Sequence, residues 1–81
     1  MEEKEYQLLN LFVCNPGKIF SRSEILKLIW GFDLKEYRYK VNSCVSRIRQ
    51  KIEPDFSNPI YILPSNEGGY KFNEQMISSK N

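Results

Sequence analysis

Two patterns coincide in the stretch Arg38-Tyr39-Lys40-Val41-Asn42-Ser43-Cys44-Val45-Ser46-Arg47-Ile48-Arg49-Gln50-Lys51-Ile52. Val41, Val45, Ile48 and Ile52 recur at helical spacing, which predicts a helix with one buried face. The stretch also holds five basic residues and no acidic one, whereas the rest of the chain holds seven basic and ten acidic residues. The formal net charge of +2 is therefore +5 in this stretch combined with −3 elsewhere. A helix that is buried on one side and cationic on the other favours a nucleic-acid partner.

The length of the chain, 81 residues, allows one domain with a small core. We expect a folded domain over residues 4–72 and a flexible polar tail over residues 73–81. No apolar run approaches the roughly 20 residues that a membrane span needs. The acidic start Met1-Glu2-Glu3-Lys4-Glu5 has the wrong sign for a secretory signal, so we expect a cytoplasmic protein that does not engage a membrane.

Enzymatic, metal and redox chemistry all lack support in this sequence. Cys14 and Cys44 both fall in apolar helical patterns, so we expect buried, reduced thiols, with a redox or disulfide role as the alternative. The chain has no histidine, and two distant cysteines do not make a metal site. It also has no glycine-rich phosphate loop after a strand and no nucleophile with an evident base. We therefore predict neither an enzyme nor a need for a cofactor.

Two further helices are expected before the cationic one. The first covers about residues 4–14 and is stopped by Asn15-Pro16-Gly17, because proline cannot continue the helical hydrogen bonds. Its expected apolar stripe consists of Tyr6, Leu8, Leu9, Leu11, Phe12 and Val13. After the short extended run Lys18-Ile19-Phe20, Ser21-Arg22-Ser23-Glu24 has the pattern of a capping box. The helix that it opens ends at Trp30-Gly31.

A β-hairpin is expected after the third helix. Ile60-Tyr61-Ile62-Leu63 and Tyr70-Lys71-Phe72 flank a turn that contains Gly68 and Gly69. Pro64 should end the first of these strands early. The predicted fold class is mainly α with a small β-hairpin (α+β), namely a winged helix-turn-helix of three helices plus a C-terminal wing. In such folds the second helix of the helix-turn-helix pair enters the major groove of DNA.

Three segments carry a more specific signal. They are Asn15-Pro16-Gly17-Lys18-Ile19-Phe20-Ser21-Arg22-Ser23-Glu24-Ile25-Leu26-Lys27-Leu28-Ile29-Trp30-Gly31, Val41-Asn42-Ser43-Cys44-Val45-Ser46-Arg47-Ile48-Arg49-Gln50-Lys51-Ile52 and Glu67-Gly68-Gly69-Tyr70-Lys71-Phe72. In this order they resemble the DNA-binding effector domain of OmpR/PhoB-type response regulators, over about residues 4–72. The resemblance implies a winged helix that binds double-stranded DNA and regulates transcription within a bacterial two-component system.

Two features depart from the pattern of this family. Its members usually begin with a small antiparallel sheet, often after a receiver domain, whereas this chain begins almost at the first helix. Whether it is a piece of a longer regulator or a stand-alone domain stays open. The wing of relatives commonly carries an arginine before glycine, where this chain has Asn66 and Glu67. That difference removes a cation expected in the minor groove.

The third helix supplies the candidate DNA contacts, because a turn of about 100° per residue places its polar residues away from Val41. The candidates for reading bases are Asn42, Ser43, Ser46, Arg47 and Gln50. Arg47 suits guanine O6 and N7, while Asn42 or Gln50 suits adenine. The candidates for phosphate contact are Arg38, Lys40, Arg49, Lys51 and Lys71. The alternative is a solvated cationic face that binds nothing.

The expected partner is double-stranded DNA, bound by two copies in tandem or as a homodimer on repeated half-sites. Five phosphate contacts predict a slope of roughly −4 to −5 in log affinity against log salt. The loop over residues 32–37 corresponds to a segment that approaches RNA polymerase in relatives, although an ordinary connector is the alternative. The competing function is a protein-interaction or dimerisation module with little DNA affinity. The operator, the regulated genes, the direction of regulation and its signal stay open.

Overall fold

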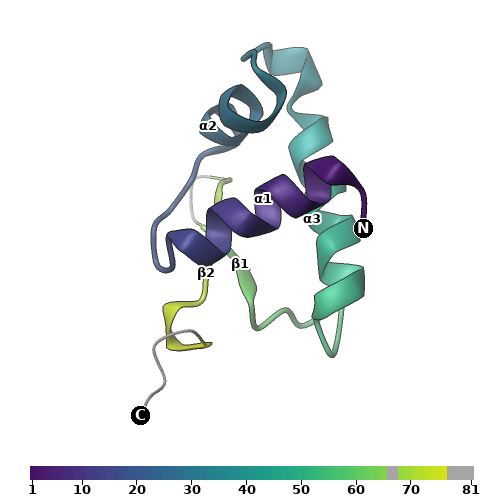
Figure 1. The fold of residues 1–81 in the computed structure, drawn as a ribbon, viewed down its shortest axis with the longest axis vertical. Coiled ribbons are helices and arrows are strands. Elements are labelled where there is room, and N and C mark those ends of the chain that lie inside the picture. Colours follow the sequence, from purple (N-terminus) through teal and green to yellow (C-terminus); the bar gives the residue numbers. More distant parts are fainter. Residues whose placement is uncertain (66–67, 77–81) are drawn as a thin grey trace.

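The computed structural model describes residues 1–65 and 68–76. Its main elements are the helices α1 (Glu3–Cys14), α2 (Arg22–Ile25) and α3 (Tyr39–Ile52) and the strands β1 (Ile62–Pro64) and β2 (Tyr70–Phe72). Short helical segments are η1 (Leu26–Trp30), η2 (Lys35–Tyr37) and η3 (Glu74–Met76). Figure 1 shows α1 crossing in front, α3 running along one side and the hairpin behind. Three helices followed by an antiparallel hairpin confirm the predicted winged-helix arrangement.

The second helix begins with the predicted capping box. The Ser21 hydroxyl accepts a hydrogen bond from the Glu24 amide, and the Glu24 carboxylate accepts one from the Ser21 amide, each at 3.0 Å. These two bonds satisfy amides that have no partner in the first turn of a helix. The helix continues through the wider π-helical turn of η1 and ends at Gly31, whose φ of 89° lies in the left-handed region.

The hairpin pairs Ile62 with Phe72 and Pro64 with Tyr70 in antiparallel register. Phe20 adds a short third pairing, because its amide and carbonyl exchange hydrogen bonds of 2.9 Å with Tyr70. The expected strand over residues 60–63 is shifted to Ile62–Pro64. The amides of Ile60 and Tyr61, which precede β1, donate instead to the carboxylate of Glu53.

The core lies between α1, α3, the α2–η1 helix and the hairpin. It consists of Leu8, Phe12, Phe20, Ile25, Leu26, Ile29, Val41, Cys44, Val45, Ile48, Ile62 and Phe72. The predicted inner face of α3 is confirmed at Val41, Val45 and Ile48, which are fully buried, whereas Ile52 at the end of the helix is only partly buried. Trp30 and Tyr70 are partly buried and pack against this core. In the described part of the chain, no helix combines the length and apolarity needed to cross a membrane.

The predicted apolar stripe of α1 is wrong in part. Leu8 and Phe12 are fully buried, but Tyr6 is 65% exposed and Val13 is also exposed. The buried face instead includes Glu5, which is 2% exposed and lies one helical turn before Leu8. The reason is a distant cation on α3 that pairs with Glu5, a contact that local periodicity does not encode.

The two cysteines have different surroundings, although both were expected to be buried. Cys44 is buried on α3, and burial raises the pKa of its thiol to about 11. Cys14 is exposed at the end of α1, where its thiol lies 3.6 Å from the Asn10 side-chain oxygen. The expectation for Cys14 was wrong because it lies beyond Phe12, the last residue of α1 in the core.

Candidate nucleic-acid interface

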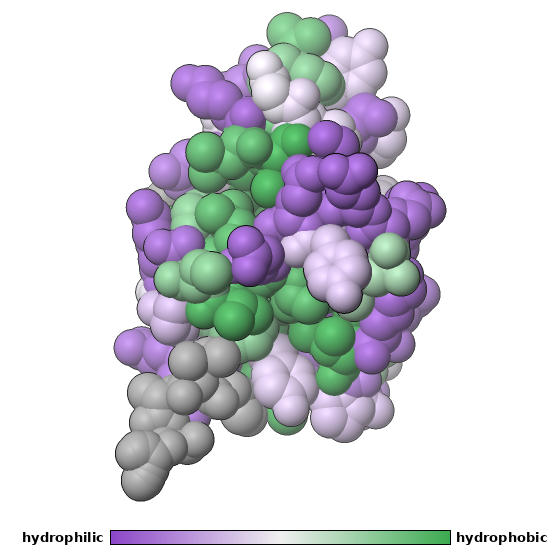
Figure 2. Space-filling model, viewed as in Figure 1, coloured by the Kyte–Doolittle hydropathy of each residue, from purple (hydrophilic) through white to green (hydrophobic). Residues whose placement is uncertain are grey.

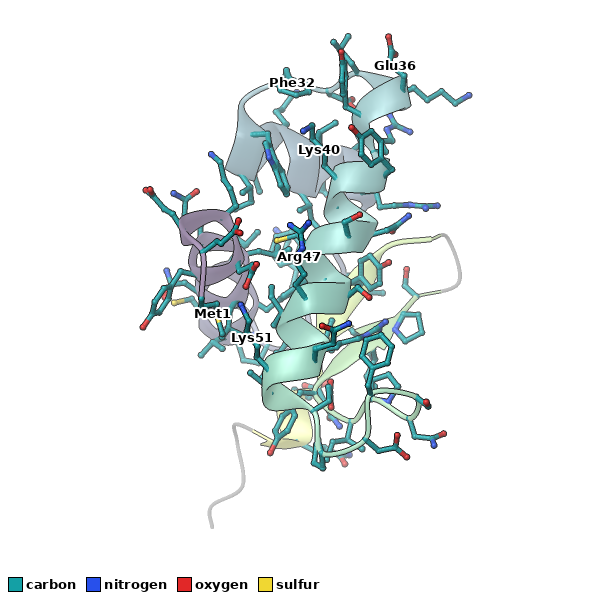
Figure 3. The ribbon with its side chains drawn as sticks, turned by 90° about the vertical axis from the view of Figure 1, so that its right-hand side faces the viewer. Met1, Phe32, Glu36, Lys40, Arg47 and Lys51 are labelled. Carbon is teal, nitrogen blue, oxygen red and sulfur yellow. The ribbon has the colours of Figure 1, made fainter. Side chains whose placement is uncertain are left out.

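One face of α3 is uncovered and polar. Ser43, Arg47 and Gln50 are exposed on it, and Ser46 is half-buried among them. Figure 3 shows α3 facing the viewer, with α1 on one side and the hairpin on the other. The structure therefore brings the predicted base-reading residues together on a single helix, flanked by the wing.

The flank of α3 beside the wing carries Asn42 and Arg49. The Tyr70 hydroxyl donates a 2.7 Å hydrogen bond to the Asn42 side-chain oxygen. The Arg49 guanidinium donates to the Ile62 carbonyl through Nη2 at 2.8 Å and lies 5.4 Å from the centre of the Tyr70 ring. Both residues were predicted to touch DNA, and both already hold the hairpin.

The opposite flank of α3 faces the start of α1, and the Lys40, Arg47 and Lys51 labels lie along it in Figure 3. The Lys51 ammonium donates to the Glu5 carboxylate at 2.6 Å, so this predicted phosphate contact has an internal partner. The Lys51 hydrogen bond holds the pKa of Glu5 below its usual value, and the charge of Arg47 acts in the same direction. Arg47 itself lines a recess of about 210 Å³ next to Glu2 and Glu5.

The start of α3 is tied to the preceding loop. Arg38 forms an ion pair of 3.1 Å with Asp33, whose carboxylate also accepts a hydrogen bond from the Ser23 hydroxyl. Hydrogen bonds from Ser23 and then Arg38 lower the pKa of Asp33. The Lys40 ammonium lies 5.7 Å from the centre of the Tyr39 ring, on the exposed end of the helix. The side chains of Arg38 and Lys40 are therefore near the surface but not without partners.

The wing contributes Lys71, which is half-buried on β2 opposite Leu63. The residues that replace the wing arginine of relatives, Asn66 and Glu67, lie outside the described residues. The hydrogen bonds from Tyr70 to Asn42 and from Arg49 to Ile62 place the base of the wing beside α3.

Sequence reasoning missed two buried carboxylates that fix this surface. The Glu53 carboxylate accepts hydrogen bonds of 2.8 to 3.1 Å from the amides of Ile60, Tyr61 and Ile62. An acidic residue at a helix C-terminus is electrostatically unfavourable, and that misfit was a usable signal for Glu53. No such signal exists for Glu5, because its partner lies 46 residues away. Among residues 1–65 and 68–76, no cluster of three or more metal-ligating side chains is found.

A three-helix fold with a hairpin wing and an uncovered polar face on its third helix defines the DNA-binding domain of a transcriptional regulator. The chain belongs to the family described as transcriptional regulatory protein, C terminal, whose model matches residues 1–72. This is a family of DNA-binding regulatory domains of the OmpR/PhoB type and not of enzymes.

Curated relatives are longer than this chain. The probable transcriptional regulator ycf27 of Cyanidium caldarium is 41% identical over 75 residues, which cover 86% of this chain and 30% of the relative. The uncharacterized transcriptional regulatory protein YcbL of Bacillus subtilis is 39% identical over 70 residues, covering 86% of this chain and 31% of YcbL. The chain thus spans less than a third of these two relatives.

Solved structures share the fold. The response regulator DrrB of Thermotoga maritima, an OmpR/PhoB homolog, superposes with a TM-score of 0.81 at 30% identity, over 90% of this chain and 33% of DrrB. The DNA-binding domain of Klebsiella pneumoniae RstA, crystallised with the RstA box, gives a TM-score of 0.81 at 23% identity. That match covers 91% of this chain and 73% of the RstA domain.

Proposed function

We propose that this domain binds double-stranded DNA in a sequence-specific manner, with α3 in the major groove and the hairpin beside the backbone. The uncovered face of α3, with Ser43, Arg47 and Gln50 exposed between the wing and the start of α1, carries this proposal. A helix with short polar side chains around one arginine can approach base edges closely. The RstA domain, which shares this fold, was crystallised in complex with its DNA box, and this supports DNA as the partner. The domain would act where a bacterial cell keeps its DNA, in the cytoplasm.

The internal contacts sort the candidate cations by how readily DNA can recruit them. The Arg38–Asp33 pair is partly exposed, so exchanging Asp33 for phosphate costs little. Releasing Lys51 would leave the buried Glu5 carboxylate without its cation, which is costly. Arg49 is held by a carbonyl and an aromatic ring. We therefore propose Arg38, Lys40 and Lys71 as the phosphate contacts and Arg47 as the main reader of guanine.

The salt dependence of binding tests this assignment. Three phosphate contacts predict a slope of about −3 in log affinity against log salt, whereas all five sequence candidates predict roughly −4 to −5. A fluorescence anisotropy titration of a selected duplex, at several salt concentrations, measures the slope. A slope near −5 would show that Arg49 and Lys51 leave their internal partners. Binding that is absent at low salt or insensitive to salt would contradict the function itself.

A substitution at Arg47 should distinguish recognition of the base sequence from non-specific electrostatic attraction to DNA. Arg47→Ala should reduce the preference for the selected site over a scrambled duplex by about tenfold or more, because a bidentate base contact is lost. The matched change Lys40→Ala should weaken both duplexes equally and reduce the salt slope by about 1. If Arg47→Ala kept the full preference, another residue would have to read the base assigned to it.

A second candidate function, self-association, is favoured by one observation on α1. Tyr6, Leu9, Asn10 and Val13 line a shallow apolar recess of about 190 Å³. Figure 2 shows hydrophobic patches, interrupted by hydrophilic residues, on the face of the molecule where α1 lies in front. Light scattering of the free domain separates the two functions. A clean monomer that binds duplex strongly favours DNA binding, with pairing only on repeated half-sites.

We also propose that the segment over residues 32–37 presents an apolar contact to RNA polymerase. Phe32 packs against the core, whereas Leu34 and Tyr37 are exposed beside it. Leu34→Ser should leave DNA affinity unchanged and reduce transcription from a bound promoter. An unchanged transcript level would favour the reading of this loop as a plain connector.

A further inference from the structure

Tyr70 links the wing to the reading helix through two different groups. Its hydroxyl donates to the Asn42 side-chain oxygen at 2.7 Å, and its ring lies 5.4 Å from the Arg49 guanidinium carbon. Arg49 is fixed in turn by its hydrogen bond of 2.8 Å to the Ile62 carbonyl. The contacts join α3, β1 and β2 at one point.

The backbone of Tyr70 is held from both sides. It pairs with Pro64 in the hairpin and exchanges two hydrogen bonds of 2.9 Å with Phe20. Gly69 allows this close approach, since a Cβ atom there would lie 2.3 Å from the Phe20 carbonyl oxygen. The backbone position of Tyr70 is therefore fixed, and its side chain orients the Asn42 amide.

The orientation of Asn42 decides what it can read. An asparagine that recognises adenine presents its oxygen to N6 and its amide nitrogen to N7 on the same base edge. In this structure the Tyr70 hydroxyl uses one lone pair of the Asn42 oxygen and holds that oxygen towards the wing, so the NH₂ group is the end of the amide left without a hydrogen-bond partner in the described part of the chain. Such a group donates to guanine N7 or O6, or to thymine O4, and gives adenine no advantage over guanine.

Resting on the proposed DNA-binding function, we propose that Tyr70 is a positioning residue that makes Asn42 a hydrogen-bond donor to bases. Tyr70 touches no base in this account and acts only through the amide that it orients. The Arg49 guanidinium holds the Tyr70 ring in place, which gives this arginine a role that needs no phosphate.

The Tyr70→Phe variant tests the inference, because it removes the hydroxyl and keeps the ring against Arg49. A duplex library with every single base-pair replacement is first used with Asn42→Ala, which identifies the pair that Asn42 reads. At that pair, Tyr70→Phe should raise the ratio of adenine affinity to guanine affinity about tenfold, since the amide becomes free for bidentate pairing. Ratios at all other pairs should change by less than about twofold.

Tyr61→Phe is the matched control. Tyr61 is another half-buried tyrosine of the same hairpin region, and its ring stacks on Phe72 with centroids 6.1 Å apart. This variant should leave every ratio unchanged. In the double variant Tyr70→Phe with Asn42→Ala, the loss of the Tyr70 hydroxyl should have no further effect at the identified pair, because the two residues act as one unit.

Three outcomes would overturn the inference while the proposed function stands. Asn42→Ala could alter no base preference, Tyr70→Phe could weaken all duplexes by one common factor, or the wild type could already favour adenine at the Asn42 pair. A wild-type domain that binds every duplex equally, or none, would instead overturn the proposed function. Thermal unfolding of each variant confirms that the compared proteins are folded.

Discussion

Buried carboxylates hold together a surface whose charge is mostly positive. Glu5 neutralises Lys51 from α1, and Glu53 gathers three consecutive amides at the entry to β1. A buried carboxylate is tolerated only when it is paired or hydrogen-bonded, and both residues meet that condition in different ways. These two residues position α3 against α1 and the hairpin.

Removing the partner of Glu5 should destabilise the domain. Lys51→Met leaves the carboxylate buried without its cation, and we expect a loss of about 2 kcal/mol in unfolding free energy near neutral pH, reduced from the fully buried case because Lys51 is half-exposed. Urea unfolding measures it, with Lys35→Met as the exposed control that should change little. A loss no larger than that of Lys35→Met would show that the pair contributes nothing.

The Glu5–Lys51 pair should also make the stability of the domain depend on pH, in a direction that follows from the pKa shift of Glu5. The pKa of Glu5 is lowered in the folded state by the Lys51 hydrogen bond. Its contribution to stability is therefore fully present above the ordinary value of 4.5 and is lost as the pH falls through the lowered folded pKa. The stability difference between wild type and Lys51→Met should be constant near neutral pH and shrink in acid. A stability difference between wild type and Lys51→Met that grows below pH 4.5 would contradict this role of the Glu5–Lys51 pair.

Residue-level prediction from sequence succeeded where the periodicity is regular. The inner positions Val41, Val45 and Ile48 and the exposure of Arg47 follow from the helical turn alone. Glu5 could not be predicted, because its burial depends on a lysine on another element. The engagement of Arg49 was equally hidden, since its partner is a backbone carbonyl that only the tertiary fold brings near.

At the scale of elements, the start of the α2–η1 helix and the edge of the wing are held by short, specific contacts. The Ser21 capping box and the Gly31 stop were visible in the sequence, as were both strands of the hairpin. The strand limits were not, because the carboxylate of Glu53 accepts the amides of Ile60 and Tyr61, which were expected to belong to the strand. The pairing of Phe20 with Tyr70 could not be predicted either, because it depends on a close approach of two segments that no local sequence pattern indicates.

Gly69 and Gly31 allow a matched test of the wing edge, the place where Phe20 pairs with β2. An alanine at Gly69 would place a Cβ atom 2.3 Å from the Phe20 carbonyl oxygen, so Phe20 and β2 must separate. An alanine at Gly31 meets no atom within 4 Å and costs only the strain of a positive φ, roughly 1–2 kcal/mol. Gly69→Ala should also weaken DNA binding, whereas Gly31→Ala should lower stability alone. Urea unfolding and duplex titration of both variants decide whether the wing edge positions α3.

The whole molecule presents two different faces. The outer face of α3 is polar and flanked by cations, while α1 exposes Tyr6 and Val13 on another side. The charge asymmetry of the sequence predicted the first face, and helical periodicity misplaced the second. The chain spans less than a third of the length of the two curated relatives compared above. How the additional residues of those longer proteins act on either face is a property of the longer proteins.

We propose that DNA meets the domain at the outer face of α3. Amide chemical-shift mapping of the labelled domain with a selected duplex tests it most directly. We expect the largest shifts at Ser43, Ser46, Arg47 and Gln50, with a second group at Lys71 on the wing. Shifts that gather instead on the exposed face of α1, with α3 unchanged, would contradict the account.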